Sequence, residues 1–367
     1  MAAHDQSNGD SKLANGETTY FATNPRPASL DEHISSLAPF IADHVRKHSR
    51  VALVTSGGTT VPLENQTVRF IDNFSAGTRG ATSAEYFLEN GYAVIFLHRQ
   101  FSLLPYSRHF SHSTNCFLDY MTTSSTGEVV IDGEYQAQMA SVLQKYERAK
   151  REKMLLLLPF TSVNEYLWHL REIAMLMRPL GANGLFYLAA AVSDFFIPAE
   201  RMVEHKIQSS EDFAHANHGT TSSTAQEERS PAAHMDGAKL VIDLDPVPKF
   251  LKQLVDVWSP KSMIVSFKLE TDPSILAEKS RYALKKYSHD LVIGNMLNTR
   301  KHEVLFVSAA GGDQWIRVPT ARRSKSVTAA TMSEVRQATE MPLEIESLIV
   351  PEVARLHSEI ISNGRSR

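Results

Sequence analysis

Short runs of apolar residues recur along the chain, separated by longer segments in which apolar positions repeat every three or four residues. The apolar runs are nearly continuous and too short for helices, so each predicts a buried strand. They cover residues 51–54, 92–97, 155–158, 185–192, 263–267 and 291–293. The helix-like segments between them cover residues 80–90, 135–153, 163–177 and 273–287. This alternation predicts an α/β fold with a mostly parallel sheet covered by helices on both faces.

The two ends of the chain differ in pattern. Ser29-Leu30-Asp31-Glu32 has the form of a capping box, so ordered sequence is expected to begin there. Residues 1–27 before it are rich in Ser, Gly, Asn and Asp and predict a disordered tail. Near the other end, residues 303–308 and 314–318 predict a hairpin, and residues 343–361 predict a last helix.

Two internal segments interrupt the alternation of strands and helices. Residues 112–134 are Ser/Thr-rich with little periodicity and predict an insertion. Residues 209–237 are rich in Ser, Thr, His, Glu and Ala, have low complexity, and predict a disordered loop. With these two segments set aside, residues 28–367 are expected to form a single α/β domain.

Composition excludes several classes of protein. Of 367 residues, 43% are hydrophobic and 22% charged, which is typical of globular proteins and argues against wholesale disorder. A formal charge of −3 argues against a protein that coats nucleic acid or an anionic membrane surface. Cys116 is the single cysteine, so no internal disulfide forms. The sequence contains no signal peptide and no apolar run long enough to span a membrane, so we expect a cytoplasmic protein, with the nucleus also open.

The densest unusual sequence lies between the first predicted strand and the next helix, over residues 54–80. It contains Ser56-Gly57-Gly58-Thr59 and ends in Ser75-Ala76-Gly77-Thr78-Arg79-Gly80. Glycines let a backbone approach phosphate oxygens, and a helix N-terminus behind them supplies N–H groups and partial positive charge. The segment therefore predicts a nucleotide phosphate site, although its spacing fits neither G-x-G-x-x-G nor Walker A. The alternative is that these glycines serve only tight turns and close packing.

Polar residues also follow three later strands. Ala190-Ala191-Val192-Ser193-Asp194 ends one strand in small residues and an acid, where open α/β sheets bind their ligands. Lys206 follows soon after, and such a cation beside a phosphate site stabilises a transferring phosphoryl group. Phe267 is suited to stack on a base, and Asn295 to bind a nucleotide by hydrogen bonds. Core packing, loop capping and solvated surface charge stay open as alternatives for these residues. The fifteen histidines show no metal-ligand spacing, so we propose no protein-built metal site.

These segments together resemble the phosphopantothenoylcysteine synthetase (phosphopantothenate–cysteine ligase) family of coenzyme A biosynthesis, in its monofunctional eukaryotic form. The matching segments are Val54-Thr55-Ser56-Gly57-Gly58-Thr59, Val61-Pro62-Leu63-Glu64, residues 68–85 and 187–195, His205-Lys206-Ile207-Gln208-Ser209-Ser210, Val247-Pro248-Lys249 and residues 266–272. The likeness covers most of residues 28–360. It implies a three-layer αβα Rossmann-like fold and a homodimer that uses a flap for dimerisation.

The resemblance also implies a reaction in two steps. The carboxylate of (R)-4′-phosphopantothenate attacks the α-phosphate of ATP or CTP, giving an acyl nucleotidylate and pyrophosphate. The amine of L-cysteine then attacks this mixed anhydride, and the nucleoside monophosphate leaves. Mg²⁺, held mainly by the triphosphate, is the expected metal ion.

By resemblance, the site residues fall into two binding groups and one catalytic group. Nucleotide binding is implied for Gly57, Ser75, Gly77, Gly80, Phe267 and Asn295. Phosphopantothenate binding is implied for Asn73, Ala190, Ala191, Asp194 and Arg69, with Arg69 reaching across the dimer interface. Catalytic roles are implied for Asn73, Lys206 and Asp194. The low-complexity loop after Lys206 lies in the family's flap segment, and it leaves open a complex with other enzymes of the pathway.

Two rival functions remain at this stage. An NAD(P)-dependent oxidoreductase shares the arrangement of strand, glycine loop and helix. The acid that such enzymes place after the second strand is replaced here by Leu97-His98-Arg99-Gln100, although a basic pair would suit NADP. The other rival is a non-catalytic scaffold subunit, which is disfavoured because both Asn73 and Lys206 are present.

Overall fold

The computed structural model describes residues 18–111, 116–208, 231–236, 239–309, 311–319 and 343–363. The chain divides into two compact units, Met1–Ser262 and Met263–Arg367, where the sequence predicts one domain over residues 28–367. Each unit is an α/β structure and is described by itself. Within the described residues, no helix is both long and apolar enough to cross a bilayer.

The first unit is built on four parallel strands. Their order in the sheet is β8 (Gly184–Leu188), β1 (Val51–Ser56), β4 (Ala93–Arg99) and β7 (Leu155–Phe160). All six residues of β1 are buried, as are six of the seven in β4. Central strands of a sheet covered on both faces carry such continuous apolar sequence, so the predicted fold class is confirmed.

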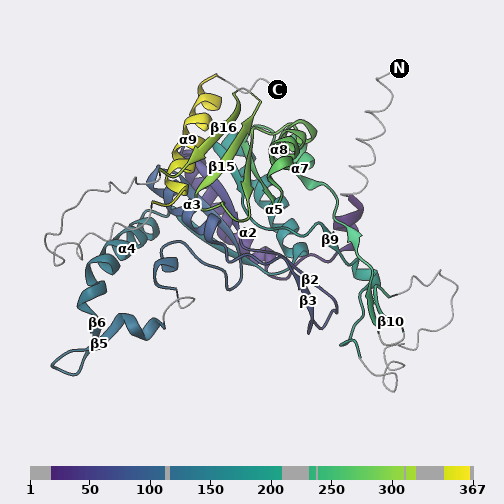
Figure 1. Ribbon diagram of the computed structural model, residues 1–367, viewed down its shortest axis with the longest axis horizontal. Helices are drawn as coiled ribbons and strands as arrows, with labels where there is room; N and C mark the ends of the chain where they lie inside the picture. The colour runs from purple at the N-terminus through teal and green to yellow at the C-terminus, as the bar shows by residue number, and fades with distance from the viewer. Residues whose placement is uncertain are drawn as a thin grey trace. The chain divides into compact units, whose positions relative to one another are not determined.

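Helices cover both faces of this sheet (Figure 1). Helix α3 (Thr78–Glu89) leads from β1 to β4, and α5 (Val163–Met177) leads back from β7 to β8. Right-handed crossovers that run in opposite directions place their helices on opposite faces of the sheet. Helix α2 (Leu30–Arg46) packs against α5, and α4 (Gly133–Arg151) precedes β7.

Smaller elements extend from the sheet. The β2–β3 hairpin (Thr60–Pro62 with Phe70–Asp72) follows β1 directly. Three further antiparallel pairs are β5 (Met121–Thr123) with β6 (Val129–Ile131), β9 (Phe195–Phe196) with β12 (Asp245–Pro246), and β10 (Ala233–Asp236) with β11 (Lys239–Ile242). Short helices are 3-10 turns at Ser107–Phe110, Phe117–Tyr120, Arg178–Asn183 and Ala199–Arg201, α7 (Phe250–Gln253) and a π-helical turn at Leu254–Trp258.

The structure corrects the predicted N-terminal tail. Residues 18–23 are helical, and Tyr20 is buried with its ring 5.0 Å from that of Phe196 and 5.2 Å from that of Phe250. Aromatic packing orders this part of the tail, so its predicted disorder is wrong; residues 1–17 lie outside the described residues. The capping box at Ser29 is also wrong, because Ser29 has helical backbone angles and its side chain caps nothing.

The two unusual internal segments contain regular structure where they are described. In the predicted insertion over 112–134, a helical turn and the β5–β6 hairpin precede α4, and residues 112–115 lie outside the described part. In the predicted disordered loop over 209–237, residues 233–236 form β10, because they pair with β11. The prediction is wrong for that strand, and residues 209–230 and 237 lie outside the described part.

The second unit combines parallel and antiparallel pairing. Strands β13 (Met263–Glu270) and β14 (Leu291–Met296) are parallel and are joined by α8 (Pro273–Tyr287). Strands β15 (Glu303–Ser308) and β16 (Gly312–Arg317) add antiparallel partners to β14, and α9 (Glu346–Asn363) follows. The core between α8 and the sheet is formed by four buried residues: Leu276, Val292, Leu305 and Val307.

Candidate active site

The loop that leaves β1 is the centre of the site. Gly57 has φ +85°, a conformation that favours glycine, and it turns the chain sharply at the carboxyl end of the strand. The N–H of Ala191 donates to Gly57 O at 2.8 Å, and the N–H of Thr59 donates to Ala191 O at 3.1 Å. The N–H of Ala190 donates to Thr55 Oγ1 at 3.1 Å. The end of β8 therefore lies on the end of β1, and both of the predicted small residues are held there by hydrogen bonds.

Asn73 reaches the same place from the β2–β3 hairpin. Its N–H donates to Thr59 O at 3.2 Å. Gly58 lies so close that a Cβ built on it would be 1.5 Å from Asn73 O. The side-chain amide of Asn73 has no hydrogen-bond partner among the described residues. That amide is therefore available to a ligand beside Gly57 and Ala191.

The predicted phosphate loop packs beside these residues. Gly77 has φ +82° and is the N-cap of α3, which has no side-chain cap. Ser56 Oγ donates to Gly77 O at 3.0 Å, and a Cβ on Gly80 would lie 2.4 Å from Ser56 Oγ. The N–H of Gly77 points to Ser75 Oγ at 3.4 Å. Close packing is thus part of why Gly80 is a glycine, and the uncapped first turn of α3 still offers N–H groups to an anion.

Asp194 lies at the rim of this site. Ser193, just before it, is tied to the loop after β1, because its N–H donates to Thr59 Oγ1 at 2.9 Å. The carbonyl of Asp194 accepts from the N–H of Val247 at 2.9 Å. Its carboxylate is 81% exposed and lies 3.7 Å from Lys249 Nζ, so it is free to turn toward a bound substrate.

Arg69 lies beside the segment that carries Lys206, at the far end of the β2–β3 hairpin. Arg69 NH1 donates to Glu64 Oε1 and to Ile207 O, each at 3.0 Å. Lys206 is exposed next to Ile207. Arg69 precedes Asn73 by four residues, and extended chain rises about 3.3 Å per residue, so the two α-carbons are about 13 Å apart. The structure places Arg69 beside the segment that carries Lys206, at the opposite end of β3 from Asn73.

Phe267 and Asn295 lie in the second unit, on neighbouring strands. Phe267 pairs with Ile293 and Leu269 with Asn295, so both predicted residues face the same side of β13 and β14. Helix α8 covers the other side, where Gly294 packs on it. Asn295 is 7% exposed, and its side-chain Oδ1 has no hydrogen-bond partner among the described residues. A buried acceptor of this kind fits a ligand N–H or hydroxyl.

Comparison with known proteins decides the family. No family model matches the chain. It is 48% identical over 356 residues to the phosphopantothenate–cysteine ligase CAB2 of Saccharomyces cerevisiae, which covers 96% of this chain and 88% of that protein. It is 38% identical over 344 residues to the phosphopantothenate–cysteine ligase of Homo sapiens, covering 92% of this chain and 96% of the human protein. The chain belongs to the phosphopantothenate–cysteine ligase family.

Solved structures agree with this assignment. A Cab2 variant superposes with a TM-score of 0.79 at 45% identity, covering 95% of this chain and 99% of that one. A Cab2 variant in complex with phosphopantothenate-cysteine gives a TM-score of 0.76 at 46% identity, with the same coverage. The predicted family is confirmed.

The residues that would suit an NADP phosphate have other partners in this ligase-family chain. His98 is buried, and burial lowers its pKa, so its ring is neutral at physiological pH. Arg99 NH1 donates to Asp72 Oδ1 at 2.6 Å. The basic pair at the end of β4 thus serves the structure around Gly57, and the dinucleotide-binding alternative loses its support.

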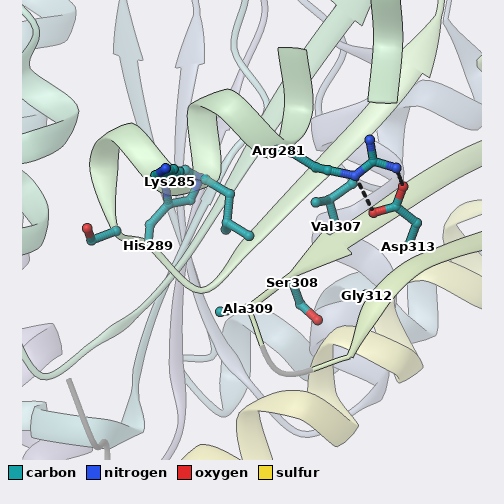
Figure 2. A pocket seen from close by; sticks show the side chains of 10 residues that line it. Arg281, Lys285, His289, Val307, Ser308, Ala309, Gly312 and Asp313 are labelled. Atoms are coloured by element: carbon teal, nitrogen blue, oxygen red, sulfur yellow. Dashed lines mark hydrogen bonds and ion pairs between the residues drawn. The ribbon is translucent and has the colours of Figure 1, made fainter. Parts of the chain in front are cut away.

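Figure 2 shows a pocket of about 480 Å³ in the second unit, with Arg281 turned toward Asp313 and ion-paired to it. Ser308 in its wall pairs with Leu291 at the start of β14, whereas Asn295 is near the end of that strand. Open α/β sheets bind ligands at the carboxyl ends of their strands. The pocket is therefore at the wrong end of β14 for the ligase chemistry.

Two residues important to this geometry were not singled out from the sequence. Gly58 is constrained by Asn73, and Glu64 is a buried carboxylate that binds Arg69. Both lie in motifs that carry the family resemblance, yet neither the glycine nor the acid had a role there. The function of Gly58 is visible only in its contact with Asn73, and that of Glu64 only in its hydrogen bond from Ile207.

Proposed function

We propose that this enzyme joins (R)-4′-phosphopantothenate to L-cysteine with consumption of a nucleoside triphosphate. The observation that carries the proposal is the convergence of Gly57, Asn73 and Ala191 on the carboxyl end of β1, beside the uncapped start of α3. Family membership supports the ligase over the oxidoreductase and scaffold alternatives. A carboxylate and an amine form a salt rather than an amide, so the carboxylate must first be activated.

In the first step, the phosphopantothenate carboxylate attacks the α-phosphate of ATP or CTP, and pyrophosphate leaves. Gly57, Ser75, Gly77 and Gly80 line the triphosphate with backbone N–H groups, while Phe267 and Asn295 hold the nucleoside. Lys206 stabilises the charge that develops on the α-phosphate. The acyl nucleotidylate that results is a mixed anhydride with a good leaving group.

In the second step, the cysteine amine attacks the acyl carbon and the nucleoside monophosphate leaves. Asn73 donates from its side-chain amide to the developing oxyanion, because this amide has no partner among the described residues. Ala190 and Ala191 leave room for the pantothenate chain, and Asp194 orients it from the rim.

Mg²⁺ fits the site as a partner of the triphosphate. Within the described residues, no three His, Cys, Asp or Glu side chains cluster as metal ligands. The glycine loop and the start of α3 instead present N–H donors suited to phosphate oxygens. Bound with the nucleotide, Mg²⁺ supplies charge neutralisation of the phosphates.

The active enzyme is a homodimer in this proposal, and Arg69 binds the phosphate of phosphopantothenate held by the neighbouring subunit. The family resemblance supports this role, and the Arg69 side chain, at 38% exposure, is accessible to a substrate from outside its own subunit. The hydrogen bonds of the Arg69 guanidinium to described residues are made by NH1. Within the described residues its Nε and NH2 have no partner, so they are available to a phosphate.

The direct test is pyrophosphate release from the purified protein with 4′-phosphopantothenate and Mg²⁺, with ATP or CTP, and with or without cysteine. The proposal expects turnover that requires phosphopantothenate and rises with cysteine, and the better nucleotide identifies the natural co-substrate. Release of ADP or CDP with inorganic phosphate would replace the acyl nucleotidylate by an acyl phosphate. Lack of turnover with either nucleotide would refute the ligase assignment.

A further inference from the structure

Glu64 is a charged residue in a place where charge is costly. It lies in the turn between β2 and β3, and its side chain is 0% exposed. Burial of a carboxylate raises its pKa, but hydrogen bonds from the surrounding N–H groups outweigh burial and leave the pKa of Glu64 below its usual range. Glu64 is therefore ionised at neutral pH. The fold retains this buried anion although a neutral side chain would avoid the cost of removing a charge from water.

Both oxygens of this carboxylate are fully used. Oε2 accepts from the N–H of Val68 at 3.3 Å and of Arg69 at 2.9 Å. Oε1 accepts from Arg69 NH1 at 3.0 Å and from the N–H of Ile207 at 3.4 Å. The carboxylate thus joins the hairpin to a segment that lies about 140 residues later in the sequence.

The later segment carries Lys206. It runs beside the hairpin turn, because Glu64 pairs with Val203 and the N–H of Asn65 donates to Val203 O at 2.9 Å. Arg69 NH1 adds a bond to Ile207 O at 3.0 Å, so one nitrogen of the guanidinium is fixed by Glu64 and Ile207 together. The same carboxylate therefore contacts both Arg69 and the segment that carries Lys206, and it helps to fix the direction of the one and the position of the other.

We propose that Glu64 is a positioning residue that holds Arg69 and Lys206 as one unit, and that this unit serves a single active site, that of the neighbouring subunit. The inference rests on the proposed ligase function and on Arg69 acting across the dimer interface. Glu64 itself touches no substrate and acts through Arg69 and the segment bearing Lys206. If Arg69 reaches the partner's phosphopantothenate, Lys206 arrives at the same site.

The test variant is Glu64→Gln. In the wild type, each carboxylate oxygen of Glu64 accepts two hydrogen bonds. The glutamine side chain accepts at its single oxygen only, so in either orientation its NH₂ group faces two N–H donors without an acceptor. Because misplacement by about 1 Å costs about 100-fold in positioned catalysis, we expect KM for phosphopantothenate to rise at least tenfold and pyrophosphate release to slow. KM for the nucleotide, which the glycine loop binds, stays near wild type.

Glu204→Gln is the matched control. Glu204 lies on the same segment but is exposed, and among the described residues its carboxylate accepts hydrogen bonds only from the Asn65 and Gln66 side chains. The control should keep kcat and KM within about twofold of wild type, as exposed polar contacts contribute little. If Glu204→Gln is as damaging as Glu64→Gln, general loosening of the junction explains both and the positioning role is wrong.

Mixed dimers decide which active site Glu64 serves. Two variants are co-expressed with different affinity tags, and dimers that carry both tags are purified. Glu64→Gln paired with Asn73→Ala should keep about half of the wild-type activity, because both defects fall on one site and the other is intact. Glu64→Gln paired with Arg69→Ala should be nearly inactive, because each site then carries one defect. The reverse pattern would overturn the proposal.

Two further results separate this inference from its premises. An inactive wild-type protein would refute the proposed function, and failure to isolate any mixed dimer would refute action across an interface. The Glu64–Arg69 coupling is then judged alone: Glu64→Gln added to Arg69→Ala should raise KM for phosphopantothenate no further, and additive losses would refute it. If Glu64→Gln does not melt cooperatively, Glu64→Asp, which keeps the charge and shortens the reach, takes its place in each arm.

Discussion

Substitution of Gly58 by alanine tests the geometry around Asn73 most directly. The added Cβ would lie 1.5 Å from Asn73 O and 2.7 Å from Asn73 C, whereas ordinary contact begins at 3.4 Å. Both neighbours are backbone atoms, so rotation of a side chain cannot relieve the overlap. The chain at Asn73 must therefore move by about 2 Å away from the loop after β1.

Such a displacement should affect activity more than stability. Overpacking in a well-packed region costs about 1–3 kcal/mol, which a domain of this size tolerates. Misplacement of a catalytic group by about 1 Å costs about 100-fold, so kcat for Gly58→Ala should fall at least 100-fold. The assay is steady-state formation of phosphopantothenoylcysteine, with a thermal melt of the same sample to verify folding.

Gly133→Ala is the matched control, because a Cβ at that position meets nothing within 4 Å and the residue begins α4. It makes the same chemical change and should leave kcat within about twofold of wild type, with equal or slightly higher stability. Wild-type kcat in Gly58→Ala would refute the argument, since Asn73 would then tolerate displacement or would not take part in the reaction.

Four other predictions concern catalysis and stability. Lys206→Ala should block pyrophosphate release; normal release would exclude its role at the α-phosphate. Asn73→Ala should still release a first equivalent of pyrophosphate and then convert the acyl nucleotidylate slowly, so rapid amide formation in a quenched-flow experiment would contradict its role. Glu85→Gln should lower the free energy of unfolding at pH 7 by about 3–5 kcal/mol, because the buried Glu85 accepts from Arg108 Nε at 2.8 Å. Burial raises the pKa of Glu85, but hydrogen bonds from His109 and Arg108 outweigh burial and hold the pKa below 4.5. Urea titrations should therefore show the stability difference between wild type and Glu85→Gln shrinking below about pH 4.5. A stability difference that does not change with pH would exclude the ion pair as its cause. Burial lowers the pKa of His169 from 6.5 to about 4, so on acidification the unfolded chain takes up this proton before the folded one. The free energy of unfolding should therefore fall by about 3 kcal/mol as the pH drops from 6.5 to 4. His169→Gln should remove this pH dependence, and an unchanged pH dependence would place its origin elsewhere.

The regular elements were largely predictable because their signals are local. The predicted helices over 163–177 and 273–287 match the bounds of α5 and α8. Each has an N-cap that bonds to the first turn, Ser162 in one and Asp272 in the other. Apolar periodicity and caps act over a few residues, so they are visible without the fold.

Elements whose stability comes from distant partners were missed. The β2 and β3 strands have three residues each, too few for a period-2 pattern, and are defined by their pairing with each other. The helix at residues 18–23 depends on aromatic partners such as Phe196 and Phe250, far along the chain. At Ser29, the capping-box pattern is present, but the backbone has already entered a helical conformation before α2 begins.

The sequence by itself determined the α/β class and the family, because both are written in short contiguous motifs, and it supplied the candidates for the site residues. Tertiary structure decided how those residues group: Asn73 with Gly57 and Ala191, and Arg69 with the segment of Lys206. It also decided the importance of Glu64, whose buried carboxylate stays ionised because N–H groups from nearby Val68 and Arg69 and from distant Ile207 converge on it. Such convergence depends on strand order and chain crossing, and these are properties of the folded chain as a whole.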